Sequence, residues 1–167
     1  PVDAVEMLAK IAAEVDPCRH PVTVRDLYKG IDIRSRLKPA HLVAIAVEAS
    51  LEYASPAAVF APTHSGTTAR SLSLFRLPVW IVAVSSFAGT CQNLVFSYGV
   101  HPVQEPDHPD DWNAYIQRWI ESHEVKGDLA ILTEGPSAKH PEANHRMEII
   151  ELKRWKGMME TDTRSGP

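Results

Sequence analysis

The sequence predicts an α/β fold in which a mostly parallel sheet is covered by helices on both faces. Short apolar runs rich in Val, Ile, Ala and Phe alternate with longer segments of helical periodicity. A helix between two strands acts as a crossover, and crossovers join parallel strands. The fifth strand follows the fourth without a helix between them, so it is expected to return antiparallel at an edge of the sheet.

Composition limits the classes of protein that the chain can belong to. Its 167 residues, 44% hydrophobic and 23% charged, suit one soluble globular domain with a real core. The net charge of −4 argues against a nucleic-acid binder. No apolar run approaches the ~20 residues that span a bilayer, and no secretory signal opens the chain. We therefore expect a cytoplasmic protein with no membrane partner, in which Cys18 and Cys91 are reduced thiols.

The N-terminal part predicts a helix followed by a connector. Residues 1–16 place Val5, Leu8 and Ile11 on one helical face. Residues 17–38 form a polar, proline-bearing connector with a short helix near its middle. Pro39 then stands at a first-turn position of a second helix that reaches about residue 53. The nearly continuous apolar surface of this helix predicts burial on several sides.

The remaining elements follow in alternation as far as residue 152. Asp110 or Asp111 is expected to cap the last helix, and Gly99 to end the helix before it. Trp80, inside a strand, is expected in the core, whereas His41 and His123 have no evident partners. A polar tail follows at 153–167. The expected strands are 57–61, 79–84, 100–103, 128–133 and 146–152, and the expected helices are 67–76, 86–98 and 111–124.

The segment 57–70 carries the clearest chemical signal. It predicts a buried strand, a tight turn with small hydroxyl side chains, and the start of a helix. The first N–H groups of a helix have no partner within it and lie at the positive end of the helix dipole, so they can bind phosphate. Gly66 lets an anion approach the backbone closely. The turn is therefore a candidate phosphate site, formed by Thr63, His64, Ser65, Gly66, Thr67 and Thr68.

Several segments, in order along the chain, resemble the C-terminal domain of pyruvate kinases. The turn is similar to the family's Thr-Lys/Glu-Ser/Thr-Gly pattern, and a Val-Glu-Ala-Ser helix end precedes it. The first helix resembles the last helix of the catalytic barrel of the same enzymes. The resemblance implies a three-layer α/β/α sandwich over residues 39–152, with a five-stranded mixed sheet whose last strand is antiparallel. The matching segments are 1–12, 47–50, 63–70, 78–84, 98–103 and 126–129.

The resemblance also implies what lies outside this chain. In pyruvate kinases, phosphoryl transfer from phosphoenolpyruvate to ADP occurs in a β/α barrel that holds Mg²⁺, K⁺ and a catalytic lysine. The sequence shows no strands of that barrel and no cluster of acidic metal ligands, so no catalytic residue or metal site is assigned. The chain is expected to be inactive alone and to act as a regulatory and oligomerisation domain.

In many family members the turn holds a phosphate of an allosteric effector, a sugar phosphate or AMP. The loop between the last two strands is the family's effector loop, so Lys139 and His140 are candidates for the other end of the ligand. His64 replaces a common lysine, which removes a fixed positive charge. Arg70 could neutralise a phosphate or be a solvated surface residue. His140 and His145 could form a metal pair, but histidines without a ligand are the preferred interpretation.

The sequence is compatible with three functions. The first is the regulatory domain of a pyruvate kinase, a homo-oligomer through this domain, and the start at Pro1 inside a barrel-type helix favours part of a longer enzyme. The second is a free-standing protein of the same domain type that binds an anionic metabolite. The third is a different enzyme acting on a phosphorylated substrate, for which Ser65 has only its neighbour His64 as a base.

Overall fold

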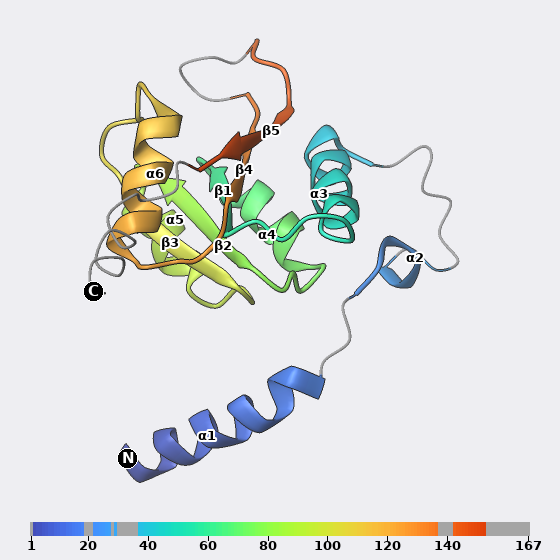
Figure 1. The fold of residues 1–167 in the computed structure, drawn as a ribbon, viewed down its shortest axis with the longest axis vertical. Helices are drawn as coiled ribbons and strands as arrows, with labels where there is room; N and C mark the ends of the chain where they lie inside the picture. Colours follow the sequence, from blue (N-terminus) through green and yellow to red (C-terminus); the bar gives the residue numbers. More distant parts are fainter. Residues whose placement is uncertain (1, 19–21, 28, 30–36, 137–141, 153–167) are drawn as a thin grey trace, which may run out of the picture.

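The computed structural model describes residues 2–18, 22–27, 29, 37–136 and 142–152. It contains a five-stranded sheet in the order β3-β2-β1-β4-β5, in which every pair is parallel except β4–β5 (Figure 1). The predicted mixed sheet with an antiparallel last strand at its edge is confirmed. The strands are β1 (Ala58–Pro62), β2 (Trp80–Ser85), β3 (Val100–Gln104), β4 (Leu129–Glu134) and β5 (Arg146–Glu151).

Helices cover both faces of this sheet, as expected for a three-layer sandwich. On one face α3, α4 and α5 pack against Val59, Ile81 and Ile131. On the other face α6 packs against Phe60, Val82 and Leu132. The helical elements are α1 (Val2–Val15), the 3₁₀ turn η1 (Asp16–Cys18), α2 (Val24–Leu27), α3 (Pro39–Ser50), α4 (Thr67–Ser73), α5 (Ala88–Leu94) and α6 (Trp112–Ser122).

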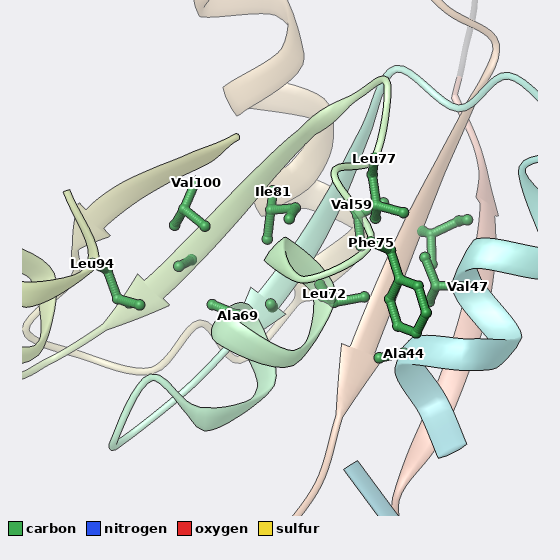
Figure 2. Close-up of a cluster of buried hydrophobic side chains, with 13 residues drawn as sticks. Ala44, Val47, Val59, Ala69, Leu72, Phe75, Leu77, Ile81, Leu94 and Val100 are labelled. Carbon is green, nitrogen blue, oxygen red and sulfur yellow. The ribbon is translucent and has the colours of Figure 1, made fainter. Parts of the chain in front are cut away.

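The central strands are buried on both faces because both helical layers cover them. Figure 2 shows the larger cluster, in which Phe75 lies beside Ala44 and Val47 of α3. Small residues of α3 face this cluster, so the helix approaches α4 closely. The predicted burial of this helix on several sides is wrong, because only the side with Ala40, Ala44 and Val47 is buried, whereas Ala46 and Ala49 are exposed.

Single residues explain why β3 is an edge strand and where α6 begins. β3 contains Pro102, which lacks an N–H to donate, and it stands at the edge of the sheet, where a proline is tolerated. At the start of α6, the Asp111 carboxylate accepts a hydrogen bond of 3.0 Å from the Ala114 N–H. Asp111 is therefore the capping residue, one of the two that the sequence offered. The buried residues of α6 are Ile116, Trp119 and Ile120.

The structure differs from the sequence prediction at Trp80 and in the length of α5. Trp80 is 56% exposed, so its prediction as a core residue is wrong. It begins β2 on the face that α6 covers, but α6 packs over Val82 and Val84 farther along the strand. The helix expected at 86–98 is shorter, since α5 ends at Leu94 and Gly99, at φ +68°, lies in a separate turn before β3.

The N-terminal helix lies apart from the sheet (Figure 1). No residue of α1 is buried, and Val5, Leu8 and Ile11 on its apolar face are each more than half exposed. None of the helices in the described ranges is long and apolar enough to cross a membrane. Both cysteines are free thiols, Cys18 exposed and Cys91 buried.

Candidate functional site

The candidate turn leaves the sheet where the strand order reverses. From β1 the chain proceeds to β2 and β3 on one side of β1. It then returns through α6 to β4, which lies on the other side of β1. Because β1 and β4 are parallel, their carboxyl ends meet at one edge of the sheet. Ligands of open α/β sheets bind at such switch points, outside the carboxyl ends of the strands. The turn that follows Pro62 therefore occupies the preferred position for a ligand in this topology.

The backbone of the turn is fixed from both ends. The Thr63 N–H donates to the Val84 carbonyl at 2.9 Å, which ties the turn to β2. The Gly66 N–H donates to Thr63 Oγ1 at 2.9 Å, and Gly66 adopts a left-handed φ of +79° just before α4. A side chain at Gly66 would be strained and would come within about 3 Å of neighbouring atoms. The glycine predicted for close approach to an anion is thus required by the fold itself.

Several donors at the turn remain open to solvent. The first helical hydrogen bond of α4 runs from the Arg70 N–H to the Gly66 carbonyl, so the preceding α4 amides have no acceptor within the helix. The hydroxyls of Ser65 and Thr67 lie 2.9 Å apart, and both residues are exposed. Thr68 is half-buried. Amide and hydroxyl donors are therefore grouped on one small surface.

The Arg70 side chain places a positive charge beside the turn. The Arg70 guanidinium donates to the Ser65 carbonyl, and a Cβ at Gly66 would lie 2.9 Å from one of its nitrogens. The His64 ring instead packs on Phe87, with 4.1 Å between ring centroids, while the His64 carbonyl accepts from Thr90 Oγ1. Arg70 is exposed and lies beside the turn, so its position is compatible with both alternatives.

The loop between β4 and β5 opens at the same edge of the sheet. At its base, Glu134 ends β4 and forms an ion pair with Arg146, which begins β5. The Glu134 carboxylate raises the pKa of Arg146, mainly through this hydrogen bond. The ring of His145 lies against Gly135. Lys139 and His140 lie outside the described residues, so their predicted role stays a prediction. The described ranges contain no group of three or more metal-ligating side chains.

A second concave surface, which the sequence did not suggest, lies between β3 and α6. It is a groove of about 880 Å³. His123 stacks on Trp119, with 4.0 Å between ring centroids and 13° between the ring planes, so the expectation that it lacks partners is wrong. Burial and the nearby His123 imidazole lower the pKa of His101. The lining includes His101, Glu105, Asp107, His108, Tyr115, Arg118, Trp119 and His123.

Tyr115 in this groove is expected to titrate far above an ordinary tyrosine. Burial, followed by the charge and hydrogen bond of Glu105, raises its pKa to about 12. Since the folded state prefers the neutral phenol, its contribution to stability is complete below pH 10 and is lost as the pH rises towards 12. The difference in absorbance at 295 nm between the protein and its Tyr115→Phe variant isolates this phenol and should show a midpoint of about 12.

Two checks make this titration decisive. Circular dichroism at each pH establishes that the chain is still folded. Glu105→Gln removes the neighbouring charge and should move the Tyr115 midpoint down, because the phenolate then forms without a like charge beside it. A midpoint of Tyr115 near 10 in the folded protein would contradict the expected effect of burial and Glu105.

Comparison with known proteins agrees with this fold. The pyruvate kinase alpha/beta domain family matches residues 41–150. The pyruvate kinase of Thermococcus litoralis is 38% identical over 165 residues, which cover 91% of this chain and 32% of that protein. Pyruvate kinase 2 of Synechocystis sp. is 30% identical over 139 residues, which cover 81% of this chain and 22% of that protein. This chain therefore spans a third or less of the length of these relatives.

The solved structures add a likeness of fold. Cryptosporidium parvum pyruvate kinase superposes with a TM-score of 0.73 at 18% identity, over 90% of this chain and 31% of that one. The matched region contains the whole sheet apart from the end of β5, together with helices on both of its faces. The chain belongs to the pyruvate kinase alpha/beta domain family.

Proposed function

We propose that this chain is the regulatory and oligomerisation domain of a pyruvate kinase, which acts in the cytoplasm in glycolysis. The whole enzyme converts phosphoenolpyruvate and ADP to pyruvate and ATP, with Mg²⁺ and K⁺ held by a catalytic barrel outside this chain. The family match and the partial coverage of the relatives support a regulatory role for this chain and a catalytic role for the barrel. The apolar face of α1, on which no residue is buried, suits a helix whose packing partner is that barrel.

The regulatory part of the proposal is a phosphorylated effector, a sugar phosphate or AMP, bound at Thr63–Thr68. The observation that carries it is the position of this turn at the strand-order reversal, with open amide and hydroxyl donors and the Arg70 guanidinium beside them. A phosphate there would accept from the α4 amides and from Ser65 and Thr67, and Arg70 would offset its charge.

Oligomerisation through this domain completes the proposal. β5 is an edge strand, and Ile149 on it is 61% exposed, so this edge can pair with another subunit. An effector that binds one association state more tightly shifts the equilibrium towards it. Regulation would then follow from binding at one edge of the sheet and assembly at another surface.

A thermal-shift titration tests effector binding directly. Fructose 1,6-bisphosphate, ribose 5-phosphate or AMP at 100 times its Kd should add about 2.7 kcal/mol to the free energy of unfolding. Thr67→Glu places a carboxylate at the turn and should weaken the affinity about 10–100-fold, because a charge-assisted hydrogen bond becomes a repulsion. Asn113→Glu, at an exposed site in the first turn of α6, adds the same charge elsewhere and should leave the affinity unchanged.

The outcomes separate the two parts of the proposal. If none of these ligands stabilises the chain, the effector site is refuted while the family membership stands. If Asn113→Glu weakens binding as much as Thr67→Glu does, the ligand does not bind at the turn.

A further inference from the structure

Two histidines from distant parts of the chain meet at the end of the β3–α6 groove. His101 lies on β3, on the sheet face that α6 covers, and His123 is the residue at which α6 ends. Their ring centroids are 5.8 Å apart, with 72° between the ring planes. Both residues are exposed, so water and ions can reach this corner.

Hydrogen bonding fixes how His123 presents its ring. Its Nδ1 lies 2.9 Å from the Trp119 carbonyl oxygen and 2.9 Å from Ser122 Oγ, whose hydrogen is donated to the same carbonyl. A carbonyl oxygen only accepts, so Nδ1 carries the hydrogen in this contact, and in the neutral imidazole the lone pair is then on Nε2. Stacking on the Trp119 indole, with 4.0 Å between centroids, holds the plane of the ring. A histidine that donates one ring N–H to a carbonyl and keeps the other nitrogen free has the usual arrangement of a metal ligand.

We propose that His101 and His123 together bind one divalent transition-metal ion. Zn²⁺ and Ni²⁺ are the candidate ions, because imidazole nitrogens are suitable ligands for both. Two imidazoles on one tetrahedral ion, each bound at about 2.0–2.1 Å, place their ring centroids roughly 5 Å apart. The observed separation is 5.8 Å, so the exposed His101 ring would turn towards His123 while Trp119 keeps the His123 ring in place.

The ion would be only partly enclosed by protein. The described residues contain no third histidine, cysteine or carboxylate grouped with this pair, so water completes the coordination. The ion would tie the edge strand β3 to the end of α6, two elements that otherwise meet there through the rings of His101, Trp119 and His123. This site is independent of the effector turn, and neither proposal requires the other.

Isothermal titration of the 167-residue chain with ZnCl₂ alone, and separately with NiCl₂ alone, tests the site. We expect one ion per chain and a higher melting temperature that EDTA reverses. His101→Ala and His123→Ala should each weaken the affinity at least about tenfold, and the double variant, which lacks both imidazole ligands, should bind more weakly than either single variant.

Matched controls come from the other histidines. His108→Ala, in the same groove, and His64→Ala, at the effector turn, should leave metal affinity unchanged. His101→Gln and His123→Gln keep much of the side-chain volume, and circular dichroism establishes that the variants are folded. The proposal is overturned if the wild type binds neither ion. It is equally overturned if the folded His101 and His123 variants bind as the wild type does, or if His108→Ala weakens binding equally.

Discussion

Replacing Phe60 with alanine should lower the free energy of unfolding by about 3–5 kcal/mol, the usual cost of removing a buried aromatic ring. Phe60 lies on the central strand β1 and is fully buried. Its ring meets Trp119 of α6 edge to face, with 5.4 Å between centroids. The truncation would leave a cavity between the sheet and α6, which packs on this face. Urea denaturation followed by circular dichroism measures the change.

Phe96→Ala is the matched control for this truncation. The Phe96 side chain is 92% exposed, so the same change of residue there should alter stability by no more than about 0.5 kcal/mol. A total stability of about 5–15 kcal/mol is usual for a domain, so the Phe60 variant should lose a large part of it. Equal effects of the two substitutions would contradict the assignment of Phe60 to the core.

The fold was largely predictable because its signals are local. The apolar runs, the cap at Asp111 and the glycine at residue 66 each act within a few residues, and the structure agrees with all three. The antiparallel β5 followed from the missing crossover helix. Trp80 was misjudged because its exposure depends on how far α6 extends over the sheet, which no local pattern states.

The candidate sites also differ in how far the sequence could predict them. The turn at Thr63–Thr68 could be found because strand, glycine and hydroxyl residues are consecutive. The position of Arg70 could not be predicted from the sequence, because only the folded turn brings its guanidinium against Ser65 and Gly66. The pair of His101 and His123 was missed because an edge strand and a helix end meet only through tertiary packing. The sequence signal for this pair is weak. It consists only of His101 sharing a strand face with Val103 and of His123 following an amphipathic helix.

Gly127→Ala should destabilise the chain by about 2–4 kcal/mol, since backbone strain and a steric clash act together. Gly127 has a φ of +153°, which side chains rarely adopt. A Cβ there would lie 2.8 Å from the Ala57 Cβ and 2.9 Å from the Ala57 backbone nitrogen. That nitrogen donates to the Leu129 carbonyl at 2.7 Å, so the substitution would push apart the strands β1 and β4 where their pairing begins.

Gly89→Ala provides a control with the opposite expected sign. Gly89 lies in α5 with no atom near an added Cβ, so alanine there should stabilise the helix by about 0.5–1 kcal/mol. Chemical denaturation of both variants measures the two changes on one scale. Stability of Gly127→Ala equal to that of the wild type would show that β1 and β4 are not closely packed at Gly127.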